Sequence, residues 1–276
     1  MLITPNLDFG VLSKAALITL TTDFGVSSPY VAAMKGSLLS TCLRVNLIDL
    51  THAIPPQDVR QAAVVLSDVT PFFPPGTLHV VVVDPGVGTA RRILYAEIGE
   101  QRYLAPDNGV LSYLVRNAAP RRLVELAESK YWRTAVSHTF HGRDIFAPVA
   151  AHLAEGVAPE QLGPGTNQMI CLAWPEPTFE ADEVQAEVLY VDTFGNAITN
   201  LPIEGLLQWL GSSGILIEVQ GREINGLQST YGRRKPGELI ALGDSQGRLE
   251  LAVVHGNAAK AVGIEPGTQV LIGRQS

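Results

Sequence analysis

The sequence predicts an N-terminal α/β domain with a mostly parallel sheet, followed by a C-terminal all-β, barrel-like domain. In residues 1–174, short apolar strand patterns alternate with helical patterns, as in layered α/β domains. In residues 178–276, short strand patterns separated by glycine-containing turns predominate. Between them, the segment AWPEP at residues 173–177 breaks both patterns and is interpreted as a linker.

The N-terminal elements follow from hydrophobic periodicity. The run TLHVVVV at residues 77–83 is typical of a strand buried on both faces of a parallel sheet. Gly99-Glu100 separates two strand patterns and predicts a hairpin between residues 93–98 and 102–105. The other predicted strands are 16–22, 45–50 and 123–126, and the predicted helices are 30–39, 59–69, 109–117 and 144–154. Gly156 stands where a helix-terminating glycine is expected.

The C-terminal part has one helical pattern, at residues 205–210. Its predicted strands are 185–191, 197–200, 215–219, 238–242, 249–254 and 269–272.

Composition excludes several classes of protein. With 46% hydrophobic and 17% charged residues over 276 positions, the chain is not disordered. A net charge of −7 argues against nucleic acid as a partner. Cys42 and Cys171 are too far apart for a CxxC metal site, and Cys42 is expected to be buried. With neither a membrane-length apolar stretch nor a signal-peptide pattern, we expect a cytoplasmic protein without a membrane partner.

Five predicted strands run into an aspartate or end beside one. In open parallel sheets, ligands bind outside the carboxyl ends of the strands, so several of these carboxylates are expected at one edge. Turn chemistry or helix capping explains any single one, but five repeats favour a ligand site. Because DxD spacing and a phosphate-binding loop are absent, an organic cation with hydroxyl groups fits better than a metal. The five are Asp23, Asp49, Asp84, Asp107 and Asp192, of which Asp49 and Asp107 are interpreted as turn or cap residues.

Two further segments carry candidate chemistry. In DPGVGTARR (residues 84–92) the glycines allow a tight turn that brings Asp84 and Arg91 together. In TFHGRD (residues 139–144) His141 precedes a glycine at a predicted helix start, where its ring can face a cleft and titrate near neutral pH. Asp144 is interpreted as a first-turn or capping acid. The remaining histidines His79, His138 and His152 are interpreted as structural.

Taken together, these motifs resemble those of the S-adenosylmethionine hydroxide adenosyltransferases, a family related to the adenosyl fluorinating and chlorinating enzymes. The resemblance covers nearly the whole chain. The motifs are TTDFG (21–25), YVAAMKG (30–36), IDLTH (48–52), DPGVGTARR (84–92), APDNGVL (105–111), TFHGRDIFAP (139–148), DTFGNAITN (192–200) and GNAA (256–259).

The resemblance implies hydrolysis of S-adenosyl-L-methionine to adenosine and L-methionine, without a cofactor or metal. It assigns Asp84, Arg91 and His141 to the activation of water. It also implies a homotrimer with sites at subunit interfaces, between the N-terminal domain of one subunit and the C-terminal domain of the next. The implied substrate-binding residues are Asp23 at the ribose, Asp192 near the methionine amine, Phe194 and Asn196 at the adenine, and Ser245, Glu250 and Val253 as further C-terminal contacts.

Two alternatives remain at this stage. The first is an adenosyl halogenase, which uses a halide as nucleophile. A charged Asp84 beside the nucleophile would repel an anion and therefore favours water. The second is a non-catalytic module that binds adenosine or S-adenosylmethionine. The identity of the products distinguishes all three.

Overall fold

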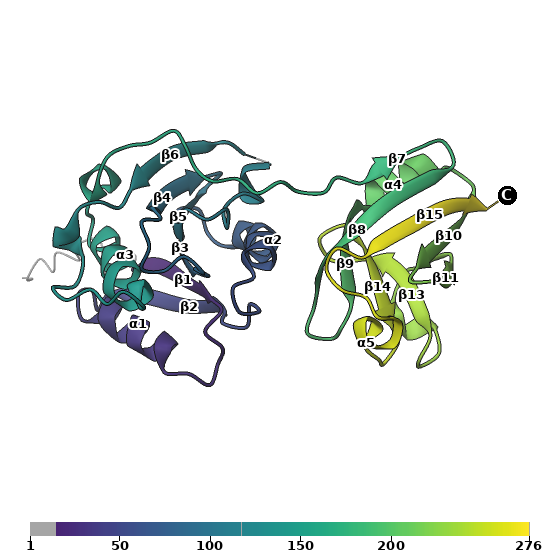
Figure 1. The fold of residues 1–276 in the computed structure, drawn as a ribbon, viewed down its shortest axis with the longest axis horizontal. Helices are drawn as coiled ribbons and strands as arrows, with labels where there is room; N and C mark the ends of the chain where they lie inside the picture. Colours follow the sequence, from purple (N-terminus) through teal and green to yellow (C-terminus); the bar gives the residue numbers. More distant parts are fainter. Residues whose placement is uncertain (1–14, 117, 276) are drawn as a thin grey trace, which may run out of the picture. The chain divides into compact units, whose positions relative to one another are not determined.

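The computed structural model describes residues 15–116 and 118–275, which form two compact units (Figure 1). The first unit ends at Leu172 and the second begins at Ala173. None of the helices in the described part of the chain is long and apolar enough to cross a membrane.

The first unit is built on a six-stranded sheet in the order β2-β1-β3-β5-β4-β6. β2, β1, β3 and β5 run parallel to one another, whereas β4 is antiparallel to β5 and β6. The expectation that four of the aspartate-bearing strands share one sheet and one edge is therefore confirmed. The strands are β1 (Ala16–Thr22), β2 (Val45–Thr51), β3 (Leu78–Val82), β4 (Ile93–Ile98), β5 (Gln101–Pro106) and β6 (Pro120–Glu125).

Helices cover both faces of this sheet. Alternate residues of β3 point to opposite faces: Val80 packs with α1 (Tyr30–Leu39) and α3 (Ala147–Ala154), whereas Val81 packs with α2 (Val59–Val69). The continuous apolar run of β3 is thus explained by burial on both sides. The short 3₁₀ helices of this unit are Thr70–Phe72, Leu114–Arg116, Ser129–Tyr131 and Pro159–Leu162.

The predicted helix at residues 109–117 is wrong. The chain makes turns there and one short 3₁₀ helix, Leu114–Arg116, while position 117 lies outside the described residues. Gly109 adopts a left-handed φ of 93°, and Leu172 occupies the space that a side chain at this glycine would need. Val110 and Leu111 are buried in a loop, so their apolar pattern indicated burial rather than a helix.

The helix predicted at residues 144–154 begins with a π-helical turn, Gly142–Phe146, and continues as α3. Its end is as expected, because Gly156 has a φ of 97° and Val157 N–H donates to the His152 carbonyl at 3.0 Å. Cys42 is buried, as predicted.

The second unit is a nine-stranded sheet in the order β11-β10-β15-β8-β9-β14-β13-β12, with β7 beside β8. β11 lies against β13, so the sheet nearly closes on itself, and the predicted barrel-like fold is confirmed. Alternate residues of β8, including Val184, Ala186 and Val188, fill its interior. The strands are β7 (Thr178–Phe179), β8 (Glu183–Val191), β9 (Ala197–Pro202), β10 (Gly214–Val219), β11 (Arg222–Asn225), β12 (Leu227–Gln228), β13 (Leu239–Gly243), β14 (Arg248–Val253) and β15 (Gln269–Gln275).

Two α-helices, α4 (Ile203–Leu210) and α5 (Ala258–Val262), and a 3₁₀ helix, Tyr231–Arg233, complete this unit. The short elements β7, β11, β12 and α5 were not predicted from the sequence.

Candidate active site

Asp84, Arg91 and His141 form a connected trio in the first unit. Arg91 Nε donates to both carboxylate oxygens of Asp84 at 2.9 Å, and its Nη2 also donates to Oδ2. The same Nη2 donates to His141 Nδ1 at 2.8 Å. Arg91 therefore bridges the acid and the imidazole, and the expected juxtaposition of Asp84 and Arg91 is present.

The loop between Asp84 and Arg91 depends on a close backbone approach at Gly88. This residue has a φ of 80°, and a Cβ added to it would lie 2.2 Å from the carbonyl oxygen of His138. Thr89 Oγ1 donates to the Gly86 carbonyl at 2.7 Å and closes the turn. The glycines of DPGVG thus let the Asp84 loop pack directly on the segment that leads to His141.

The hydrogen bond from Arg91 decides the tautomer of His141. A guanidinium has donors only, so Nδ1 must accept and the proton of the neutral ring sits on Nε2. Burial, together with the positive charge of Arg91, lowers the pKa of His141 below its usual value of 6.5. At neutral pH the ring is therefore uncharged and offers Nε2–H as a donor.

Asp144 holds the segment before His141. Its side chain is fully buried, accepts from Ser137 N–H at 2.9 Å and pairs with Arg143 Nε at 2.7 Å. Burial raises the pKa of Asp144, but the Arg143 and Ser137 hydrogen bonds outweigh this effect and the net pKa is lowered. Asp144 lies in the first turn, as predicted, and its carboxylate also ties residues 133–137 to the π-helical turn.

Asp23 follows β1, the strand next to the one that Asp84 follows. Its Oδ2 accepts from Gln57 N–H at 2.8 Å. The neighbouring Phe24 packs edge-on against Phe140, with 5.8 Å between ring centroids, so the Asp23 loop touches the residue before His141. Gln57 was not singled out from the sequence, because its role rests on a backbone N–H that any residue carries.

The interpretation of Asp49 as a turn or cap residue is wrong, whereas Asp107 does lie in the bend after β5 but its side chain bonds outside that bend. Asp49 lies in β2, 2.6 Å from Lys35 Nζ, and its Oδ1 is 3.0 Å from His52 Nε2. Asp107 is buried and pairs with Arg92 at 2.6 Å, and its other oxygen accepts from Ile170 N–H at 2.7 Å. Lys35, Arg92 and Ile170 are distant in sequence from the acids they contact, which a local turn pattern cannot reveal.

In the second unit, the β8–β9 turn brings together three of the predicted residues. Asp192 Oδ1 accepts from the backbone N–H groups of Phe194 and Asn196 at 2.9 and 2.8 Å. Asp192 therefore stiffens the turn, while the Phe194 ring is 75% exposed and free to contact a ligand.

The remaining three predicted residues are spread along β14. Glu250 lies within the strand and is buried, Val253 ends it, and Ser245 lies in the exposed turn before it. Ser245 and Val253 are thus at opposite ends of β14, and the structure does not bring them together. Burial raises the pKa of Glu250, with a further contribution from the charges of Asp192 and Asp244.

Sequence reasoning missed Tyr231, whose hydroxyl donates to Glu250 Oε1 at 2.7 Å. Tyr231 sits in a polar turn segment that carries no periodic signal, so nothing in the pattern marked it.

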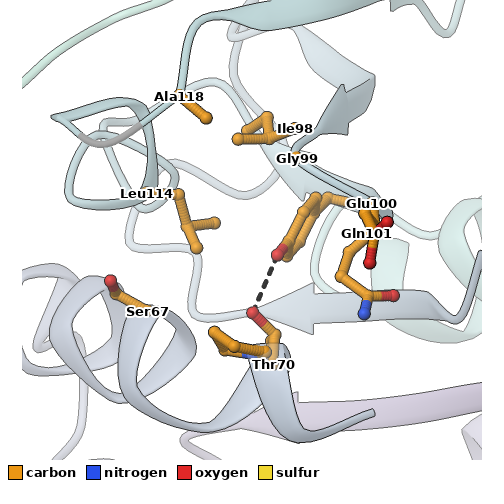
Figure 2. Close-up of a pocket in the computed structure, with 10 residues that line it drawn as sticks. Ser67, Thr70, Ile98, Gly99, Glu100, Gln101, Leu114 and Ala118 are labelled. Atoms are coloured by element: carbon orange, nitrogen blue, oxygen red, sulfur yellow. Dashed lines mark hydrogen bonds between the residues drawn. The ribbon is translucent and has the colours of Figure 1, made fainter. Parts of the chain in front are cut away.

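Two cavities of the first unit differ in the residues that line them. One of ≈ 360 Å³ is lined by Arg91 and His141 together with Trp132, His138 and other residues. Another, of ≈ 240 Å³, lies at the amino end of β5, where Ser67, Thr70 and Leu114 surround it (Figure 2). The acidic side chain in its lining, Glu100, is exposed. The first cavity is lined by two members of the trio, Arg91 and His141, and is therefore the candidate site.

The described residues contain no group of three or more His, Cys, Asp or Glu side chains arranged to hold a metal ion.

Comparisons with known proteins identify the family. The N-terminal domain of the SAM hydroxide adenosyltransferases matches residues 18–163, and their C-terminal domain matches residues 186–271. The chain belongs to the SAM hydroxide adenosyltransferase family.

Among relatives, an (R)-S-adenosyl-L-methionine hydrolase from Salinispora tropica is 39% identical over 92% of this chain and 97% of its own length. A fluorinase from Actinoplanes sp. is more distant, at 28% identity over 67% of this chain and 71% of its own length. The crystal structure of an uncharacterized conserved protein from Thermotoga maritima matches with a TM-score of 0.88 and 35% identity, covering 93% of this chain and all of that one. The similarity to the family thus extends through both units of the chain.

Proposed function

We propose that this protein hydrolyses S-adenosyl-L-methionine to adenosine and L-methionine, with Asp84, Arg91 and His141 activating the water. The observation that carries the proposal is the hydrogen-bonded trio beside a cavity, within a family whose relatives include a curated hydrolase. Asp84 also favours water over halide, because its carboxylate would repel an anionic nucleophile.

In the reaction, a water oxygen attacks C5′ and the C5′–S bond breaks, with the bonding electrons passing to sulfur. Since the sulfonium becomes a neutral thioether, the leaving group needs no acid. The attacking water must lose a proton and be held in line with the breaking bond. Base catalysis of this kind contributes about 10²–10⁴-fold.

The hydrogen bonds suggest how the trio divides this task. His141 Nδ1 is occupied by Arg91, so its ring donates through Nε2–H and orients the water oxygen. Asp84 is the remaining group that can accept the proton, because its Oδ1 accepts only from Arg91 Nε and keeps a second lone pair. Arg91 fixes both partners. Asp84→Asn, which keeps the shape and removes the charge, is expected to lower kcat by at least about 100-fold.

A product assay tests the function. Purified protein is incubated with S-adenosylmethionine, as the (S) and the (R) sulfonium epimers separately, with and without halide, and the products are resolved by chromatography. Adenosine and methionine in equal amounts support the proposal. Halo-deoxyadenosine formed only with halide would mean a halogenase, and unchanged ligand that still binds would mean a non-catalytic module. Either result would overturn the proposal.

The substrate contacts are part of the proposal. Asp23 would hold the ribose diol, Asp192 would lie near the methionine amine, and Phe194 and Asn196 would contact the adenine. Ser245, Glu250 and Val253 complete the C-terminal set. The support is the family membership and, for Phe194, the exposed ring above a stiffened turn. Phe194→Ala is expected to raise KM for the substrate, with kcat changed less.

We also propose a homotrimer in which the N-terminal domain of one subunit and the C-terminal domain of the next share each substrate. Co-expressed Asp84→Asn and Phe194→Ala subunits with different tags test this directly. At a substrate concentration far below the raised KM of Phe194→Ala, random mixing in a shared-site trimer restores about one quarter of the sites, whereas sites within one subunit are not restored. Light scattering gives the subunit number. The cytoplasmic location and the lack of a cofactor remain predictions, checked by cell fractionation and by activity after dialysis against a chelator.

A further inference from the structure

The loop that carries Asp23 is held by a buried hydrogen bond at its base. Thr22, the last residue of β1, is fully buried, and its Oγ1 lies 2.9 Å from His52 Nδ1. The same hydroxyl accepts from Phe24 N–H at 3.3 Å. Thr22 therefore connects the residue after Asp23 to a buried histidine of the neighbouring segment.

Two further contacts tie the same loop to that segment. Gly25 N–H donates to the His52 carbonyl at 2.8 Å, and Gln57 N–H donates to the Asp23 carboxylate at 2.8 Å. Gln57 makes this contact with a φ of 66°, a left-handed conformation that residues other than glycine rarely adopt. The segment from His52 to Gln57 thus makes hydrogen bonds to the Asp23 loop at two points, the Gly25 N–H and the Asp23 carboxylate.

His52 also contacts Asp49, which in turn pairs with Lys35. Its Nε2 lies 3.0 Å from Asp49 Oδ1, off the line of a good hydrogen bond, and Lys35 Nζ is 2.6 Å from Asp49 Oδ2. The IDLTH motif is therefore connected to the base of the Asp23 loop through side chains from β1, β2 and α1.

We propose that Thr22 and His52 are positioning residues, which hold the Asp23 carboxylate in the orientation that binds the substrate's ribose diol. This inference rests on the proposed function, in which Asp23 is the ribose anchor. A carboxylate on a loop binds a diol well only if it is already held in place, because ordering the loop on binding would cost affinity. Both residues act through the loop that carries Asp23, so their loss should weaken binding more than chemistry.

The strand that contains Thr22 also provides a matched control. Thr19, three residues earlier in β1 and equally buried, makes the same kind of bond, from its Oγ1 to His79 Nδ1 at 2.7 Å. Thr22→Val and Thr19→Val each delete one such hydroxyl and keep the β-branched shape. Thr22→Val is expected to raise KM about 3- to 10-fold with kcat within about twofold, because it removes the hydrogen bonds of the Thr22 hydroxyl to His52 and Phe24. Thr19→Val should leave KM unchanged.

A second pair tests His52 without altering the strand. In His52→Asn the amide occupies the place of Nδ1 and can still bond to Thr22, whereas His52→Phe removes the bond and keeps the bulk. The asparagine variant should have a KM close to wild type, and the phenylalanine variant should have a raised KM, as Thr22→Val does. If Thr22→Val does not fold, these two His52 variants still test whether the Thr22–His52 bond positions Asp23.

The outcomes separate this inference from the proposed function. If wild-type protein forms no adenosine, the proposed function fails and this inference fails with it. If wild-type protein is active but Thr22→Val and His52→Phe keep the KM of their controls, the positioning role alone is wrong. A fall in kcat with unchanged KM would also overturn it.

Discussion

Substituting His141 with asparagine or glutamine separates the functions of its two ring nitrogens. The asparagine amide reaches roughly the position of Nδ1, so it can accept from Arg91 but has nothing at Nε2. The glutamine amide reaches the position of Nε2 and can donate to the water, but it loses the bond to Arg91. In the structure that bond is 2.8 Å long and His141 is 9% exposed, so solvent is poorly placed to replace either group.

The magnitudes follow from these contacts. If Nε2–H donates to the oxygen that attacks C5′, its loss in His141→Asn should lower kcat by about 10²–10³, or about 3–4 kcal/mol. His141→Gln loses a hydrogen bond to a charged group, worth about 1.5–3 kcal/mol, and should lower kcat by about 10- to 100-fold. Single-turnover formation of adenosine, followed by chromatography, measures both. If His141→Asn were the more active variant, the donor role of Nε2 would be refuted.

The pH profile provides an independent check of the same reasoning. The active ring is neutral, and burial together with Arg91 lowers the pKa of His141 below 6.5. The activity should therefore stay level as pH falls through 6.5 and decline only at lower pH. A decline that begins above pH 6.5 would contradict the assignment.

Three further predictions concern the first unit. Gly88→Ala places a Cβ 2.2 Å from the His138 carbonyl oxygen, at a residue whose φ is 80°, and should lower kcat at least about tenfold. In the control Gly86→Ala the nearest atom is 3.4 Å from the new Cβ, so the kcat for adenosine formation should be nearly unchanged. Burial lowers the pKa of His79 to about 4. Below pH 6.5 the His79 imidazole is therefore protonated in the unfolded chain, whereas in the folded chain it stays neutral until the pH approaches 4. Stability should therefore fall by about 2 kcal/mol from pH 7 to pH 5, and urea unfolding of His79→Asn should lack this part of the pH dependence. Asp107→Asn should destabilise the protein by about 1.5–3 kcal/mol in urea unfolding, because it removes the charge from a buried carboxylate that accepts two hydrogen bonds from the partly exposed Arg92; unchanged stability would mean that the pair is dispensable.

Most elements could be predicted because their patterns are local. The strand at Ala16–Thr22 and the helices at Tyr30–Leu39 and Val59–Val69 have the predicted bounds, since each buries an apolar set at its own period. The failure at residues 109–117 has the opposite cause. Val110 and Leu111 are buried by contacts with other parts of the unit, and Gly109 bends the chain where a helix would have had to continue.

The roles of the aspartates also depend partly on local sequence and partly on tertiary contacts. The sequence pattern identified a group of aspartates at strand ends and singled out Asp84, but it could not separate the roles of the others. Asp49, Asp107 and Asp144 are distinguished by partners that lie 14, 63 and 7 residues away, and these contacts exist only once the sheet and its helices are packed.

The sequence by itself therefore determined the two-part architecture, the family and the residue types of the candidate trio, since periodicity and motif order are properties of the chain alone. Only the tertiary structure decided that Arg91 bridges Asp84 and His141, which nitrogen of His141 keeps its proton, and that Thr22 and His52 support Asp23. The reason is physical. A hydrogen bond's direction and a ring's tautomer depend on which donors lie within about 3 Å, and that distance is set by folding.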